Sequence, residues 1–298
     1  MKIRFPALAV LAAVAALSPL GAGRAALAQL VPPVRLPAPR EPRTGEEAVR
    51  VQWAVVGDAK PGAIVRVAAT FAIHPKWHIY WINPGESGAP TRLSIELPEG
   101  CRPVAERKGR PVVDHPAPQV IRHSDVTIGY EGEVTLSFAV RLPDALPEGG
   151  LPARVKADWL VCRESCLLGS NAAEIDLARP VAADDPAVAR LAESLRTVPT
   201  ALPAGWKVSV VAGEGDAATL VVALPGDLAD ATILYLPLDT PGVALAEGVV
   251  AETRGPEARI PLTIARDEAP EGGLRAAGVI VVGNGGGAHA FDLPVPVQ

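Results

Sequence analysis

The 298-residue chain is poor in several residues that mark specialised classes of protein. It has three cysteines, too few for a dense disulfide framework, and one methionine, too few for a Met-rich copper-handling surface. It has 28 basic residues against 33 acidic ones, which argues against a nucleic-acid partner because such binding needs clustered Lys and Arg. Beyond the N-terminal region no run of 18 apolar residues occurs, so the sequence predicts no further membrane span.

Glycine and proline, in contrast, are abundant, at 28 and 31 residues. The hydrophobic fraction of 49% is high enough to build cores and argues against a disordered chain. Frequent turn residues with few long helical patterns indicate short strands joined by turns. We therefore expect an all-β protein of one to three domains.

The first 28 residues have the pattern of a signal peptide. Lys2 and Arg4 precede an apolar stretch over residues 5–20, and Ala26-Leu27-Ala28 supplies a small-x-small cleavage pattern. Cleavage there makes Gln29 the first residue of the mature chain, in the periplasm or outside the cell. The alternative is an uncleaved membrane anchor, for which the stretch is just long enough.

The rest of the chain divides by composition into four parts. Residues 29–44 read as a Pro-rich tail, 45–180 as a β-sandwich, 181–205 as a helix with a linker, and 206–298 as a second, smaller β-domain. The sandwich prediction rests on alternating apolar residues, which are typical of half-buried strands. The pattern is strand-like from Val49 to Leu97, with strands expected over 64–73 and 92–97. Further strands are expected over 119–122, 133–141, 154–162 and 173–178, then 206–212, 218–224, 231–236, 258–264, 276–282 and 288–293.

Three connecting segments carry their own signals. Residues 98–118 are rich in Pro and Gly and predict a long irregular loop. Asp185 and Pro186 fit the cap and first position of a helix, which we expect to end before Pro199. Residues 284–287 (Asn-Gly-Gly-Gly) suit a hairpin turn better than a phosphate-binding loop, because a strand rather than a helix follows them.

The strongest chemical signal is the Cys-x3-Cys motif of Cys162 and Cys166. A three-residue loop can bring the two Cα atoms within disulfide distance, and the closed loop is so small that the bond adds little stability through chain entropy. A reversible redox disulfide, an inert local disulfide and a metal site completed by His74 and His78 all remain open at this point. Arg163 would favour a thiolate, and its neighbour Glu164 would oppose it.

Other notable residues have alternative interpretations. Phe71, Trp77, Tyr80 and Trp81 form either a core patch beneath the Asn83-Pro84-Gly85 turn or a lining of the cysteine site. Trp77, Tyr80, Trp81 and Trp159 are the candidate lining residues.

The remaining cysteine and two of the histidines carry weaker signals. Cys101 follows a predicted turn and is either free or paired with a partner protein, and His115 and His123 are expected to be solvated.

Three separated motifs resemble a known family. Residues 76–90 (KWHIYWINPGESGAP), 129–132 (GYEG) and 158–169 (DWLVCRESCLLG) are similar to the N-terminal periplasmic domain of the DsbD/ScsB-type thiol:disulfide interchange proteins. The resemblance covers roughly residues 45–180. The block that follows resembles, more weakly, a second β-domain of the ScsB-like branch.

The resemblance implies an immunoglobulin-like sandwich in which Cys162 and Cys166 are the redox pair, with no cofactor and no metal. The implied function is a periplasmic thiol:disulfide exchange module that takes electrons from a thioredoxin-like or DsbD/CcdA-type membrane protein. The implied recipients are periplasmic disulfide-containing proteins, in a context that includes cytochrome c biogenesis.

The resemblance covers the exchange module and no membrane or thioredoxin-like domain, so we expect another polypeptide to supply the electrons. Whether the chain is itself a protein-disulfide reductase is not decided by the sequence. A non-catalytic β-sandwich that scaffolds a partner, in copper tolerance or cytochrome assembly, is the rival hypothesis.

Overall fold

The structure is a computed structural model that describes residues 41–122, 125–228, 230–283 and 286–296. The predicted signal peptide, its cleavage before Gln29 and the Pro-rich tail up to residue 40 lie outside the described residues. In the described ranges, neither α-helix has the length and apolar character needed to cross a bilayer.

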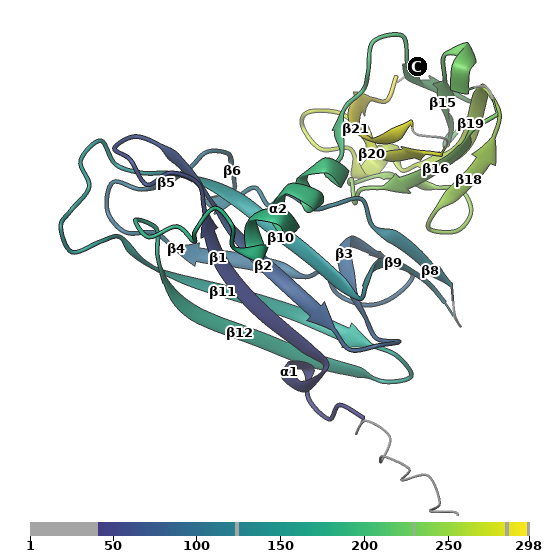
Figure 1. Ribbon diagram of the computed structural model, residues 1–298. Helices are drawn as coiled ribbons and strands as arrows, with labels where there is room; N and C mark the ends of the chain where they lie inside the picture. The colour runs from purple at the N-terminus through teal and green to yellow at the C-terminus, as the bar shows by residue number, and fades with distance from the viewer. Residues whose placement is uncertain (1–40, 123–124, 229, 284–285, 297–298) are drawn as a thin grey trace, which may run out of the picture. The chain divides into compact units, whose positions relative to one another are not determined.

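The elements fall into an earlier and a later block (Figure 1). The earlier block comprises α1 (Gly45–Ala48), β1 (Val49–Val56), β2 (Ile64–Ile73), β3 (His78–Gly85), β4 (Arg92–Glu96), β5 (Arg102–Pro103), β6 (Glu106–Arg107), β7 (Arg110–Pro111), β8 (Gln119–Arg122), β9 (Val126–Glu131), β10 (Glu133–Arg141), β11 (Pro152–Cys162) and β12 (Cys166–Asp176). The later elements are α2 (Pro186–Thr197), β13 (Thr200–Ala201), β14 (Lys207–Ala212), β15 (Ala217–Ala223), η1 (Gly226–Leu228), β16 (Thr232–Pro237), β17 (Val243–Leu245), β18 (Ala251–Arg254), β19 (Glu257–Ile264), η2 (Arg266–Glu268), β20 (Arg275–Val282) and β21 (Gly287–Pro294).

The earlier block is a sandwich of two antiparallel sheets. One sheet has the strand order β1-β2-β10-β5, and we call it the helix-covered sheet; the other, the cysteine sheet, has the order β12-β11-β3-β9-β8, with β4 also paired to β11. Fully buried side chains fill the space between them, among them Phe71, Ile79, Trp81, Leu136 and Phe138. The predicted sandwich is confirmed, and its core is apolar on both inner faces, as a two-layer fold requires.

Helix α2 packs on the outer face of the helix-covered sheet. The Asp185 carboxylate accepts a hydrogen bond of 2.8 Å from the Ala187 N–H and a proline opens the helix, as the sequence predicted. Leu191 and Ser194 face the sheet and are buried. The Ser194 hydroxyl donates a hydrogen bond of 2.5 Å to the backbone carbonyl of Thr135 on β10, which ties the helix to the strand beneath it.

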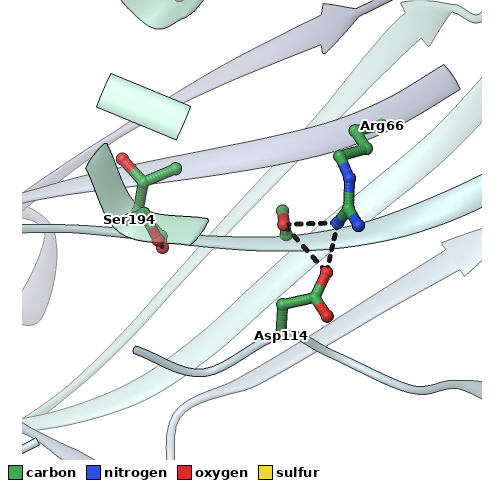
Figure 2. A network of polar contacts seen from close by, with 5 residues as sticks. Arg66, Asp114 and Ser194 are labelled. Atoms are coloured by element: carbon green, nitrogen blue, oxygen red, sulfur yellow. Dashed lines mark hydrogen bonds and ion pairs between the residues drawn. The ribbon is translucent and has the colours of Figure 1, made fainter. Parts of the chain in front are cut away.

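The segment 98–118 is more ordered than the predicted irregular loop. It contains the two-residue strands β5, β6 and β7, and Asp114 forms a β-bridge with Ser137 of β10. The guanidinium of Arg66 on β2 pairs with the Asp114 carboxylate, as Figure 2 shows, and also donates to the Ser137 hydroxyl. Strands β5 and β7 each end at a proline, and the pairing of β5 and Asp114 with β10 fastens the segment to the sheet.

Helix α1 lies against the edge strand β12. The Thr44 side chain accepts from the Glu47 N–H and caps the helix. A Cβ at Gly45 would come within 2.4 Å of the Leu168 carbonyl oxygen, so only glycine allows this approach. The Glu46 carboxylate accepts a hydrogen bond of 3.0 Å from the Ser170 N–H, and this backbone bond is the largest cause of the lowered Glu46 pKa. The helix therefore occupies part of the exposed edge of β12.

The later block contains two further sheets, with orders β13-β21-β20-β16-β18 and β14-β15-β19-β17. Its buried residues include Leu220, Ile233, Tyr235, Ile260 and Ile280. Among the described residues, every strand pair lies within one block or the other. The division into separate domains at 181–205 stays a prediction.

Most predicted strands agree with the structure to within one or two residues, but the return strand after the cysteines does not. Predicted over 173–178, it begins at Cys166 and pairs with β11 along its whole length. Residues 166–172 lack an alternating apolar pattern, so their extended conformation comes from the ladder rather than from local propensity. Strand β9 and a separate strand β3 were also not predicted. The short strands β13, β17 and β18 were missed because two to four residues carry no periodicity.

Candidate redox site

The two cysteines close the β11–β12 hairpin. Cys162 is the last residue of β11 and Cys166 the first of β12, and they are directly paired across the ladder. Their Cα atoms are 4.2 Å apart and their sulfurs form a disulfide. Within the three-residue loop the Arg163 N–H donates to the Ser165 carbonyl at 3.1 Å, which folds the loop tightly. The disulfide therefore lies at the tip of a hairpin.

The two cysteines differ in exposure, which the sequence did not predict. Cys162 is only 4% exposed, whereas Cys166 is an exposed residue. The reason is the strand order, because β11 has β12 on one side and β3 on the other, while β12 is at the sheet edge. A partner protein can reach the disulfide from the Cys166 side.

His78 lies beside Cys162 on the neighbouring strand. The two are directly paired between β3 and β11, and His78 is also paired with Glu131 of β9. Cross-strand partners share a face of the sheet, so the imidazole and Cys162 lie on the same side. His78 is 4% exposed, and its ring meets the Tyr80 ring edge-on at 5.2 Å with Nε2 3.4 Å from the Tyr80 hydroxyl. The buried end of the disulfide thus has an aromatic and polar surrounding.

Tyr80 is covered by the loop that follows β3. A Cβ at Gly88 would come within 2.2 Å of the Tyr80 ring, and Gly88 has a φ of +101°, so glycine is required there on two counts. Burial raises the pKa of Tyr80, and the negative charge of Asp125 raises it further. The phenol is therefore a neutral hydrogen-bonding group beside His78.

The four predicted lining residues separate onto two faces. Trp77, Trp81 and Trp159 are part of the buried core, where Trp159 meets Phe71 edge-on at 5.9 Å. Tyr80 alone of the four lies on the same sheet face as the cysteines, since it follows His78 by two residues. The core-patch interpretation fits the three tryptophans, and the lining interpretation fits Tyr80.

Arg163, between the cysteines, is held by two carboxylates. Its guanidinium lies 2.6 Å from Glu41 Oε1 and 3.3 Å from Glu164 Oε1. The hydrogen bond to Glu41 is the main cause that raises the Arg163 pKa. Two negative charges thus lie against the positive charge that would favour a thiolate, and the opposing effect of Glu164 on the thiolate stays a prediction.

The other candidate residues lie apart from the disulfide. Cys101 is a free, half-buried cysteine, and burial raises the pKa of its thiol. His115 is half-buried rather than solvated as predicted, and burial lowers its pKa to about 4. His123 lies outside the described residues. Among the residues that are described, no three His, Cys, Asp or Glu side chains are grouped to hold a metal ion, and His74 bonds its neighbour Pro75.

An apolar pair next to the disulfide was missed by sequence reasoning. Leu160 and Leu168 are directly paired across the hairpin, two residues from Cys162 and Cys166 respectively, on the same face. Leu168 is 80% exposed. Each leucine lies two residues from a cysteine in the sequence, but only the hairpin register shows that the two leucines are paired with each other on the cysteine face.

Comparison with known proteins agrees with this geometry. Residues 44–176 match the family described as "Thiol:disulfide interchange protein DsbD, N-terminal". A solved structure described as "Crystal structure of the N-terminal periplasmic domain of ScsB from Proteus mirabilis" aligns with a TM-score of 0.57 at 16% identity, over 84% of this chain and 94% of that chain. At that identity the alignment shows a shared fold.

Two other results carry no argument. A second solved structure is described as "The Enterococcus faecalis MSCRAMM ACE binds its ligands by the collagen Hug Model". It aligns over 83% of this chain and 96% of that chain, at 11% identity, with a TM-score of only 0.22. No curated protein matches the sequence. Residues 44–176 thus match the model of the DsbD N-terminal domain family, and the alignment with ScsB shows that the chain shares the fold of that immunoglobulin-like β-sandwich protein.

Proposed function

We propose that the chain is a periplasmic thiol:disulfide exchange module that passes electrons through Cys162 and Cys166. The electrons come from a membrane or thioredoxin-like donor and go to periplasmic proteins with disulfides. The observation that carries the proposal is a disulfide at a hairpin tip with one exposed and one buried cysteine, in a domain that matches the DsbD N-terminal family. A disulfide that closes so short a loop adds little to stability, which also favours an exchange role.

Loading the module with electrons takes two exchange steps. A thiolate of the donor attacks Sγ of Cys166, the Cys162–Cys166 bond breaks, and Cys162 leaves as a thiolate that takes up a proton. The second donor thiol, after losing its proton, attacks the donor sulfur of the mixed disulfide and releases Cys166 as a thiolate. The donor ends as a disulfide, and the module has gained two electrons.

Reduction of a substrate runs through the same two cysteines. The Cys166 thiolate attacks the substrate disulfide, forms a mixed disulfide and releases one substrate thiolate. Cys162 then loses its proton and attacks Sγ of Cys166, which restores the module disulfide and releases the second substrate thiolate. The exposure of Cys166 and the burial of Cys162 support this order, because the first attack needs contact with a partner and the second is internal.

A redox titration of the mature protein tests the proposal. We expect mass spectrometry to count two thiols that appear together, with Cys101 unchanged, at a potential of roughly −120 to −270 mV. Cys162→Ser should accumulate a mixed disulfide through Cys166, and Cys101→Ser, the matched control, should not. A bridge that resists reduction down to about −300 mV, with no trapped partner, would favour the scaffold hypothesis instead.

A further inference from the structure

A groove on the outer face of the cysteine sheet begins beside the disulfide. Its volume is about 440 Å³, and its apolar lining includes Ala89 and Pro90 from the loop after β3 and Leu160 and Leu168 from the hairpin. Leu168 is 80% exposed and lies two residues, about 7 Å, along β12 from Cys166. The exposure of so large an apolar side chain beside Cys166 suggests that a partner covers Leu168.

The two carboxylates at the groove already have partners, whereas the side chain of Arg92, the third charged residue of the lining, forms no ion pair or hydrogen bond among the described residues. The Glu46 carboxylate accepts from the Ser170 N–H at 3.0 Å, and Asp158 pairs with Lys156 at 2.8 Å. A cationic occupant would have to compete with these contacts and an anionic one could pair only with Arg92, whereas an apolar side chain would only displace water from Leu160 and Leu168. The chemistry of the groove therefore favours an apolar occupant.

Because the groove lies close to Cys166, the apolar side chain that fills it would belong to the protein that forms a mixed disulfide with Cys166. A partner that forms a mixed disulfide with Cys166 must cover the surface around it, and even a small transient interface hides about 600 Å² per partner, a disc of roughly 14 Å radius. Leu168 lies well inside such a disc. A protein whose interface is centred on Cys166 therefore buries Leu168, whereas a small thiol need not.

We infer that Leu168 anchors the protein partner of the exchange reaction, and that its occupant is an apolar side chain beside the reactive cysteine of a thioredoxin-like protein. The inference rests on the proposed function, since the mixed disulfide at Cys166 places the partner here. The thioredoxin-like class is the one that the DsbD N-terminal family implies. Leu168 selects among partners and takes no part in the sulfur chemistry.

The experiment compares a protein reductant with a small one. The disulfide of the mature protein is reduced by thioredoxin and, separately, by dithiothreitol, and the ratio of the two second-order rate constants is taken for each variant. Leu168→Ser should lower this ratio about tenfold, the loss expected when most of a leucine contact is removed. Leu168→Met should keep the ratio close to that of the wild type, because it keeps the apolar surface.

Ile64→Ser is the matched control. Ile64 is also exposed, at 44%, but it begins β2 in the other sheet, nine residues from the end of the strand at Ile73. It should leave the ratio unchanged. Both serine variants remove an exposed side chain, so both should fold.

Each other outcome would overturn the inference or the function beneath it. An unchanged ratio in Leu168→Ser, or an equal fall in Ile64→Ser, overturns the inference. Wild-type protein that reacts with dithiothreitol but not with thioredoxin overturns the partner class, and protein that reacts with neither overturns the proposed function. A wild-type dimer in sedimentation velocity that Leu168→Ser converts to monomer would show that the occupant is a second copy of the chain.

Discussion

The outer faces of the two sheets in the sandwich differ in solvent exposure. On the helix-covered sheet, outward residues such as Thr70 and Thr135 are 5% and 4% exposed, and their hydroxyls are 2.9 Å apart beneath α2. On the cysteine sheet, outward residues such as Lys156 and Leu168 are exposed. One face is closed by a helix, while the other stays open where the disulfide lies.

The sequence patterns reflect this difference. Strand β10 is buried on both faces along most of its length, whereas β11 alternates between buried positions and exposed or half-buried ones from Pro152 to Val161. A closed face stabilises the fold, and an open face is free to meet a partner. Substitutions on the closed face should therefore lower stability without changing exchange, and substitutions on the open face should do the reverse.

The largest expected effect comes from opening the closed face. Leu191→Ala removes a buried leucine, 3% exposed, from α2 and should lower the free energy of unfolding by about 2–5 kcal/mol. Leu168→Ala, on the open face, should stay within about 0.5 kcal/mol of wild type. Denaturant unfolding of both variants measures the contrast, and equal losses would show that the two faces do not differ as described.

The next effect depends on pH and concerns His115. Its neighbours fasten the segment to the closed side, because Asp114 bridges to Ser137 and the Ala117 N–H donates to the Thr197 carbonyl of α2. Burial lowers the His115 pKa from 6.5 to about 4, so the folded state holds the ring neutral where the unfolded chain would protonate it. Stability is complete above pH 6.5 and falls as the pH drops from 6.5 towards 4.

The full loss at low pH should be at most about 3 kcal/mol, from the size of the pKa shift. His115→Gln cannot take up the proton, so its stability should fall less steeply than that of wild type between pH 6.5 and 4. Chemical denaturation at several pH values measures both slopes. Parallel curves for the two proteins would mean that His115 is not the group responsible.

The smallest effect concerns a single hydrogen bond on the closed face. Ser194→Ala removes the donor to the Thr135 carbonyl and should cost about 1 kcal/mol of unfolding free energy. Ser170→Ala is the control on the open face, because only its backbone N–H is engaged, and it should change stability by under about 0.5 kcal/mol. Thermal unfolding at one pH compares the pair, and a larger loss in the control would contradict the contrast.

The parts of the fold that the sequence predicted well are those with a strong local signal. Strand β2 follows from its run of β-branched and apolar residues, and α2 from the Asp185 cap and the proline after it. Strand β12 was predicted too short, because residues 166–172 are extended only through pairing with β11. Pairing between strands depends on the register of the whole sheet, which local patterns do not contain.

The candidate site shows the same limit. The spacing of Cys162 and Cys166 allowed their pairing but left a metal site open, and the family resemblance was needed to predict the pair and its role. The burial of Cys162, its neighbour His78 and the exposed Leu168 were not predicted, because each depends on which strand lies next to β11. The three tryptophans were ambiguous for a related reason, since a cluster of aromatic residues in sequence does not say which face of a strand each will take.

Helix α1 has a consequence for solubility. An edge strand that carries an exposed leucine is a template on which strands of other copies can add and aggregate. Here Gly45 lies against the Leu168 carbonyl, and the Glu46 carboxylate occupies the Ser170 N–H, so part of the edge cannot accept another strand. The hairpin can thus display an apolar side chain while a single turn of helix blocks strand addition along this part of its edge.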